Sequence, residues 1–479
     1  MYFAANFLGS SAVKYIFLVI VVLNFLIIFT KDWKHSVEAI IMFSFIEGQG
    51  RVVWGYNPFF RIVFDLLVIL ATSKNFISHK KLYRSEIIPS YLKYFIFFHF
   101  LWYLLLLFNP IGVPFYYSIL TAKYYIAPIL LFFSFTLSYK DINDEFIASI
   151  IKTIVIFSSV QVILSIFQMY HKEDFMYSIS GYYKNLFTKF EVFTGQAYRP
   201  WGTTHMPGAP SVYLFLSVGV IFLTKSKKIS SKIFKVIYVA CSWFALLLLQ
   251  VRSAWMKHIA IVAFSLGFYF LTQKNRAANI IKFLVIISVI TFAIFNNFQL
   301  YQKYAFGLDL EGSIDRIKQI DSIDKMSKKR SGVSTIFSVG VKNFRLLGFG
   351  LGLGGGVNLK AFKDEQNRLR VNENIHFWSF DNFFLFSFQE LGLGAFFYIG
   401  IYFFTIIYLI TIVIKSFKCK YKSSIISAVS LVVCFVLFIG AWGAVSLCFN
   451  PDSFYFWMWA SLGIASFFNE KLKLEKNII

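Results

Sequence analysis

Continuously apolar runs, each roughly 17–25 residues long, recur along the chain and constrain its fold more than any other feature. A helix of that length crosses the hydrocarbon core of a bilayer. Because that core offers no water to backbone groups, a spanning segment is either a helix or a strand of a closed barrel, and these runs lack the alternation of barrel strands. Hydrophobic residues make up 58% of the chain, and the mean hydropathy is +0.65. We therefore predict an all-α polytopic membrane protein with about twelve transmembrane helices.

The connections between the runs suggest a single membrane domain covering residues 1–479, since neither an internal repeat nor a low-complexity linker interrupts it. The apolar stretch Ser36–Ile46 is too short to span and is predicted to be a surface or re-entrant helix. Residues 298–392 form the largest polar segment, a loop between the ninth and tenth spans. The predicted spans are 13–30, 58–73, 91–108, 114–138, 146–168, 209–224, 233–250, 255–272, 281–297, 393–415, 425–449 and 453–468.

The net charge of +23 is distributed in a way that predicts sidedness. Lysine and arginine gather in alternate connections, whereas 109–113 and 450–452 contain neither. The positive-inside rule then places both termini in the cytoplasm. A nucleic-acid partner would require a soluble basic domain, which the sequence lacks. The stretches predicted to lie outside are 31–57, 169–208 and 298–392.

The residues that usually mark metal, disulfide or nucleotide sites do not form a recognisable pattern. The four cysteines do not suggest a disulfide framework, and the seven histidines are dispersed. We predict neither a metal site nor a cofactor. The glycine-rich stretch Gly348–Gly356 lacks the Gly-Lys-Ser/Thr ending of a phosphate-binding P-loop, and it is expected to be a flexible or tightly packed loop edge.

Three arginines fall in segments predicted to lie outside, namely Arg199 in RPWGTTH, Arg252 in QVRSAW and Arg330 in KKRSG. A guanidinium group makes bidentate contacts with phosphate, so such residues suit a phosphate-bearing ligand at the membrane surface. Each arginine also has a simpler interpretation. Arg252 could anchor the interface beside Trp255, Arg199 could be a solvated residue of a helix-entry loop, and Arg330 could belong to a solvated basic face.

Two further polar residues precede the tenth predicted span, in the segment NIHFWSFDNFFLF. His376 and Asp381 could each accept a proton from a sugar hydroxyl. Asp381 could equally be the N-cap of the helix that follows. Deeper in the same segment, Glu390 is expected to need a partner within the membrane, and the sequence does not identify one.

Three motifs resemble those of the superfamily of bacterial O-antigen polymerases (Wzy) and O-antigen ligases (WaaL), which includes protein O-oligosaccharyltransferases. QVRSAW is similar to the S-R-S-x-W turn of that superfamily, with Val251 where serine is usual. RSGVSTIF followed by LLGFGLG resembles its arginine-bearing loop, and DNFFLFSFQELGLGAFF is similar to its H-N-x-x-L…E-x-G-x-x-G re-entry motif. The resemblance covers roughly residues 195–410. Asp381 stands where the ligases carry histidine, which favours a polymerase.

The resemblance implies a GT-C-like glycosyltransferase fold and a glycan on undecaprenyl pyrophosphate as donor and acceptor. Arg252 and Arg330, which match its motifs, would bind the pyrophosphate, with Arg199 as a further candidate, and Asp381 or His376 would act as the base. The expected activity is metal-independent polymerisation of O-antigen, capsule or exopolysaccharide repeat units at the outer face of the bacterial plasma membrane. A chain-length regulator would be an additional partner.

Two alternatives remain open. An O-antigen ligase or oligosaccharyltransferase would use the same donor but transfer the glycan to lipid A-core or protein. A lipid-linked sugar transporter is less favoured. Transporters often show repeated halves with charge at the bilayer midplane, whereas this sequence has no repeat and its notable charges are predicted to gather at one side.

Overall fold

The computed structural model describes most of the N-terminal and C-terminal thirds of the chain. The described residues are 2–54, 59–78, 87–108, 121–170, 237–238, 240–246, 383–419, 421–441 and 452–476, with single residues at 115, 119, 257, 260, 261 and 447.

Every regular element of these described residues is a helix. Three helices within them are long and apolar enough to cross a membrane: α4 (Ser90–Leu107), α8 (Asp144–Tyr170, apolar to Gln168) and α21 (Ala395–Lys418, with the 3-10 turn η4, Gly392–Gly394, in front of it). They coincide with the predicted spans 91–108, 146–168 and 393–415. The protein is therefore a helical membrane protein.

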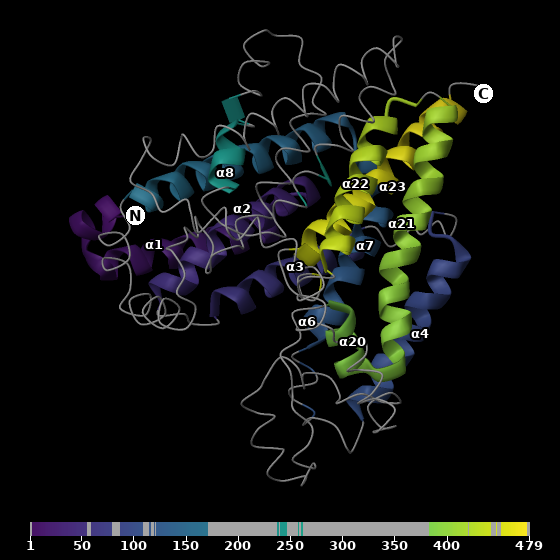
Figure 1. The fold of residues 1–479 in the computed structure, drawn as a ribbon, viewed down its shortest axis with the longest axis horizontal. Helices are drawn as coiled ribbons and strands as arrows, with labels where there is room; N and C mark the ends of the chain where they lie inside the picture. Colours follow the sequence, from purple (N-terminus) through teal and green to yellow (C-terminus); the bar gives the residue numbers. More distant parts are fainter. Residues whose placement is uncertain are drawn as a thin grey trace, which may run out of the picture. The chain divides into compact units, whose positions relative to one another are not determined.

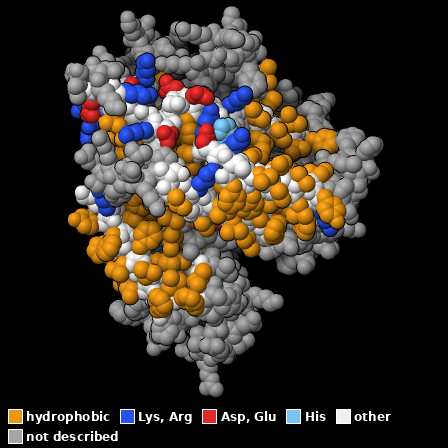
Figure 2. Space-filling view, turned by 180° about the vertical axis from the view of Figure 1, so that it is seen from behind, with side chains coloured by type: hydrophobic (Ala, Val, Ile, Leu, Met, Phe, Trp, Pro, Cys, Tyr) orange, Lys and Arg blue, Asp and Glu red, His pale blue; other side chains and the backbone are white. Residues whose placement is uncertain are grey.

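Large hydrophobic side chains on these helices point outward rather than into a core. Along α21 the exposed residues Phe396, Phe403, Ile410 and Ile414 lie on one face, since they recur at helical spacing. Figure 2 shows apolar side chains covering much of the described surface, whereas charged side chains gather in a limited area. Such a large exposed apolar surface is expected where lipid, not water, surrounds the helices.

The chain divides into two compact units, which are described separately. Unit 1 comprises Met1–Ala71 and Glu145–Asp321, and unit 2 comprises Thr72–Asp144 and Ser322–Ile479.

Unit 1 begins with three helices, α1 (Tyr2–Thr30), α2 (Trp33–Val53) and α3 (Phe59–Ser78, whose last turns belong to unit 2). The two-residue connection at Lys31 and Asp32 makes α1 and α2 a tight hairpin (Figure 1). The end of α2 packs on the start of α3, where a Cβ atom at Gly50 would lie 2.6 Å from the Phe60 ring.

The helix α2 differs from its prediction as a short surface or re-entrant helix over Ser36–Ile46. It is 21 residues long and largely buried. Polar residues such as Glu38, Glu47 and Arg51 lower its hydropathy, but they lie in a helix that packs against α1, α3 and α8. Tertiary contact, rather than hydropathy, therefore determines the length of this element.

The start of α2 lies beside the start of α8, and the two helices run in parallel. Lys34 Nζ lies 2.9 Å from Glu145 Oε1, and further along the two helices the rings of Phe45 and Phe157 lie 5.6 Å apart. This arrangement contradicts the predicted order of spans, which places residue 34 outside and the connection before residue 146 inside.

Unit 2 is built around α21, α22 (Ser424–Gly440) and α23 (Asp452–Lys476), which pack side by side in Figure 1. The helix α4 covers α21, and α7 (Ala127–Leu137) covers α23. A short helix, α20 (Phe383–Leu391), precedes η4 and α21. The predicted loop 298–392 therefore ends in a helix of nine residues, Phe383–Leu391, which is followed by Gly392.

One other predicted span is interrupted, and a second is described only in part. The span 114–138 contains α6 (Ala122–Tyr125), a turn at Ile126 and then α7, with Pro128 in the first turn of α7. Proline is favoured there because it lacks the N–H that would otherwise be unpaired. The span 425–449 corresponds in its first part to α22, Ser424–Gly440, and residues 442–446, 448 and 449 lie outside the described residues. The predicted spans 209–224 and 281–297 lie outside the described residues, and 255–272 is described only at residues 257, 260 and 261. Half of the span 233–250 is described, at 237–238 and 240–246, and these residues are helical.

Candidate functional site: the re-entry segment and its buried polar support

The five residues predicted to carry the chemistry lie outside the described residues. They are Arg199, Arg252, Arg330, His376 and Asp381, and each remains a prediction. The structure does describe the chain from Phe383 onward, two residues after Asp381. The re-entry segment consists of α20, η4 and the first turns of α21. The structure therefore shows this segment and the residues that pack around it.

Two glycines explain why the re-entry segment bends between α20 and α21. Gly392 has φ of 55°, a left-handed conformation that glycine adopts without steric cost. A Cβ atom at Gly394 would lie 2.0 Å from Cδ1 of Trp102 on α4. The indole Nε1 of Trp102 donates a 2.8 Å hydrogen bond to the carbonyl oxygen of Leu391. The bend thus brings a backbone acceptor at the end of α20 to a donor on α4.

Glu390, in the last turn of α20, is fully buried and has a partner that the sequence does not reveal. The hydroxyl of Tyr125, on α6, donates a hydrogen bond to Glu390 Oε2. A buried carboxyl group is strongly destabilising unless its oxygens are hydrogen-bonded. This contact therefore ties α20 to α6 across 265 positions of sequence.

A layer of aromatic residues surrounds the Tyr125–Glu390 contact. His99 Nε2 lies 3.2 Å from the carbonyl oxygen of Tyr125, and the His99 ring stacks on Tyr398 with centroids 5.0 Å apart. The Tyr398 hydroxyl donates a 3.1 Å hydrogen bond to the carbonyl oxygen of Tyr124. It also lies 3.2 Å from the hydroxyl of Tyr402.

The same network continues to α23, where Trp457 Nε1 donates to the Tyr402 hydroxyl over 3.2 Å. The Tyr402 hydroxyl oxygen also lies 3.4 Å from Ser453 Oγ. All of these aromatic side chains are buried. Because no reactant would reach such side chains without rearrangement, the network is suited to holding the re-entry segment rigidly rather than to reacting itself.

Hydrogen bonds at the other end of unit 2 join connections that are rich in lysine. Glu470 on α23 accepts 2.7 Å hydrogen bonds from the backbone N–H groups of Lys422 and Ser423. The side chain of Asn469 donates a 2.7 Å hydrogen bond to the carbonyl oxygen of Ile142. We call this the lysine-rich end of unit 2, formed by 138–142, 415–423 and 469–473. The re-entry segment lies at the opposite end of α21.

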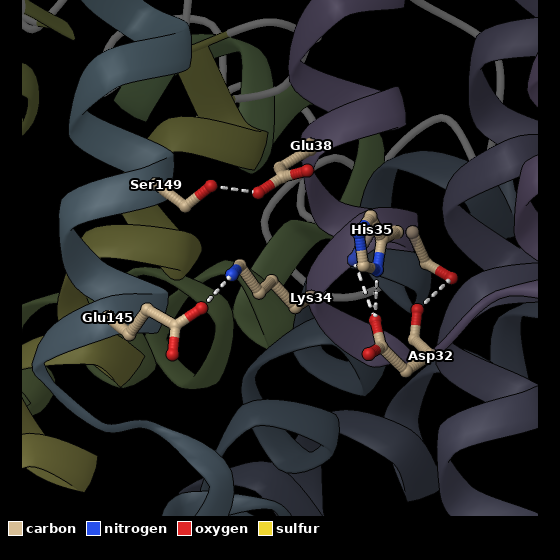
Figure 3. A network of polar contacts seen from close by, with 7 residues as sticks. Asp32, Lys34, His35, Glu38, Glu145 and Ser149 are labelled. Atoms are coloured by element: carbon tan, nitrogen blue, oxygen red, sulfur yellow. Dashed lines mark hydrogen bonds and ion pairs between the residues drawn. The ribbon is translucent and has the colours of Figure 1, made fainter.

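Unit 1 contains a second polar cluster, which joins the starts of α2 and α8 (Figure 3). Lys34 pairs with Glu145 at 2.9 Å, and the Ser149 hydroxyl donates a hydrogen bond to Glu38. In front of them, Asp32 Oδ1 accepts a 3.0 Å hydrogen bond from the backbone N–H of His35 and lies 2.6 Å from His35 Nδ1.

The ionisation of Asp32 is shifted by this arrangement. Burial raises the pKa of its carboxyl group, but the hydrogen bonds and charge of His35 outweigh burial, so the pKa lies below its ordinary value of 3.8. Asp32 is thus a charged N-cap for α2.

Metal-ligand types do not cluster in the described part of the chain: no group of three or more His, Cys, Asp or Glu residues there could hold a metal ion. Cys241, Cys419 and Cys434, all within that part, are free thiols.

Sequence reasoning missed Tyr125, His99 and Trp102 as supports of the re-entry segment. The available signal was weak but real. His99, Trp102 and Tyr103 occur at helical spacing inside an otherwise apolar run, and polar-tipped aromatic residues in such a run mark the face that meets another helix.

A comparison of the sequence with protein-family models finds no match, and a comparison with curated proteins finds none either. The class of the protein therefore rests on its fold, which is that of a helical membrane protein.

Proposed function

We propose that the protein polymerises oligosaccharide repeat units carried on undecaprenyl pyrophosphate, at the outer face of the plasma membrane. The observation that carries the proposal is the form of the re-entry segment. The stretch that resembles the re-entry motif of O-antigen polymerases and ligases is a short helix, a glycine bend and a long apolar helix, and its glutamate is bonded to a neighbouring helix. A rigid support of this kind suits a site that has to orient two membrane-bound substrates.

The proposed mechanism is displacement at the sugar carbon that bears the pyrophosphate. A hydroxyl group of the incoming lipid-linked unit attacks that carbon, the carbon–oxygen bond to pyrophosphate breaks, and the growing chain leaves its carrier. Asp381 or His376 takes the proton of the attacking hydroxyl. Arg252 and Arg330, assisted by Arg199, stabilise the negative charge that develops on the departing diphosphate.

The arginine assignment is tested with purified full-length protein in detergent, supplied with a lipid-linked repeat unit. Arg252→Ala and Arg330→Ala should each lower glycan lengthening by about 100-fold or more, because each removes a donor to the developing charge. Arg252→Lys should restore little, because an ammonium group cannot make the bidentate contact. Arg276→Ala, in a predicted cytoplasmic connection, is the matched control and should lengthen glycan normally. Polymer of normal length from Arg252→Ala would overturn the pyrophosphate role.

The same preparation separates polymerisation from its alternatives. Lengthening of a lipid-linked glycan in detergent, without a sealed compartment, excludes pure transport. Transfer to lipid A-core or to a protein acceptor, without lengthening, would instead identify a ligase or oligosaccharyltransferase. In cells, loss of a polymerase leaves single repeat units on the core, whereas loss of a ligase leaves polymer on the lipid carrier.

A further inference from the structure

The helix α2 has the length of a membrane crossing. At ~1.5 Å per residue, its 21 residues extend about 30 Å, which matches the hydrocarbon thickness of a bilayer. Its polar residues turn inward: Glu47 and Arg51, one helical turn apart, are largely buried, with Oε1 and Nη1 at 3.7 Å. Ion pairs inside a helical bundle are tolerated in membranes where they face protein rather than lipid.

The start of α2 is on the same side of the membrane as the start of α8. The contacts of Lys34 with Glu145 and of Glu38 with Ser149 both join residues 111 positions apart, so the two helices run in register. The helix α8 begins directly after the connection 138–142, which belongs to the lysine-rich end of unit 2. By the positive-inside rule that end is cytoplasmic.

The end of α2 is on the opposite side. It packs on the start of α3, with the Trp54 and Phe60 rings 6.1 Å apart. The last turns of α3 belong to unit 2, where the side chain of Asn75 donates a 2.7 Å hydrogen bond to Ser134 Oγ in the last turn of α7. Since α7 ends at the connection 138–142, α3 finishes at the cytoplasmic side. A helix of 20 residues that finishes there begins at the outer side.

We infer that α2 is an additional membrane crossing that runs from the cytoplasmic to the outer side, parallel to α8, and that the N-terminus of the chain therefore lies outside. The charges agree: residues 1–13 contain neither lysine nor arginine, whereas Lys31 lies in the α1–α2 turn and Lys34 follows it in the first turn of α2. The sides predicted for all later connections, including those of Arg199, Arg252 and Arg330, are unchanged. The inference does not depend on the proposed function.

The test uses the full-length chain with its four cysteines replaced, and single cysteines introduced on either side of α2. In spheroplasts of the expression host, a membrane-impermeant maleimide should label Asn57→Cys, which follows α2. It should label His35→Cys, at the start of α2, only after permeabilisation. The native Cys419, restored alone, is the control for the cytoplasmic side, because it is exposed within the lysine-rich connection. Labelling of both introduced cysteines in sealed spheroplasts would overturn the inference.

A second measurement does not depend on cysteine reactivity. An epitope tag placed before Met1 should bind antibody on sealed spheroplasts, and the same tag placed after Ile479 should bind only after permeabilisation. Protection of the N-terminal tag in sealed spheroplasts would place both termini inside and return α2 to a re-entrant position. Neither measurement uses glycan transfer, so a failed polymerase assay does not affect its outcome.

Discussion

Glu390 shows how an ionisable residue is accommodated in the apolar interior of this protein. The sequence alone marks it as a buried carboxyl group that needs a partner, because it stands inside an apolar run. It does not identify Tyr125, which lies 265 positions earlier in another apolar run. The pairing depends on how α20 and α6 come together, and nothing in the local sequence of either helix encodes it.

Replacing Tyr125 should test the strength of this contact. Tyr125→Phe removes a hydrogen-bond donor from buried Glu390 while keeping the ring, and it should lower the free energy of unfolding by about 1–3 kcal/mol. Glu390→Gln should cost less, because its side-chain oxygen still accepts from Tyr125. Thermal unfolding in detergent measures both. Tyr94→Phe, an exposed tyrosine on α4, is the matched control, and an equal loss there would show that the effect is not specific to the buried contact.

The N-cap of α2 offers a prediction at the surface. Asp32→Ala should destabilise the protein by about 0.5–2 kcal/mol, because it leaves the His35 N–H without its acceptor, whereas Asp32→Asn should cost much less. Because the folded pKa of Asp32 is depressed, its charge stabilises the fold fully above its ordinary pKa of 3.8. This stabilisation by the Asp32 charge is lost as the pH falls through the lower pKa of the folded state. Unfolding of the wild type and both variants at neutral and acid pH tests this. A difference in stability between the wild type and the variants that grows on acidification would contradict it.

At the scale of elements, hydropathy located the most apolar helices well and the more polar ones poorly. The helices α4, α8 and α21 lie close to their predicted bounds because a long apolar run has few alternatives in a bilayer. The helix α2 is about twice as long as its predicted apolar stretch, because its polar residues are satisfied by α8 and by one another rather than by water. The break between α6 and α7 also went unpredicted, although Pro128 was a visible signal.

The bend between α20 and α21 is predicted to depend on Gly394. Gly394→Ala should lower the free energy of unfolding by about 1–3 kcal/mol, since its methyl group would displace the Trp102 indole and break the hydrogen bond to Leu391. Thermal unfolding in detergent measures the loss. Leu393→Ala is the matched control within the same turn, because the Leu393 side chain is 48% exposed, and its change should be within about 0.5 kcal/mol. Equal stability of Gly394→Ala and the wild type would mean that the indole can move without cost.

For the whole molecule, the sequence predicted a helical membrane protein, and the structure agrees. The predicted site residues Arg252, Arg330, Arg199, His376 and Asp381 lie outside the described residues, so their roles rest on motif order and predicted sidedness. Charge placement predicts sidedness only where loops are distinctly basic. The stretch 31–57, which was predicted to be an external connection, is of mixed charge. It is there that the predicted order of spans conflicts with the contacts of α2.

A prediction at this scale concerns metal ions. Glycan lengthening by the purified protein should be unchanged by EDTA, because guanidinium groups rather than a divalent cation are proposed to stabilise the diphosphate. The measurement is product length with and without chelator, and restoration by Mg²⁺ or Mn²⁺ after inhibition would contradict the arginine mechanism. A metal-dependent glycosyltransferase assayed in the same buffer serves as the positive control for chelation.

Composition and apolar run length by themselves determined the class of protein and the approximate place of its most apolar helices, because transfer of backbone into lipid leaves few other solutions. Tertiary structure alone decided which buried polar groups meet, as Tyr125 and Glu390 do, and on which helix α2 packs. Such contacts join residues far apart in the chain, and their stability comes from desolvated hydrogen bonds and ring packing that exist only once the helices have assembled.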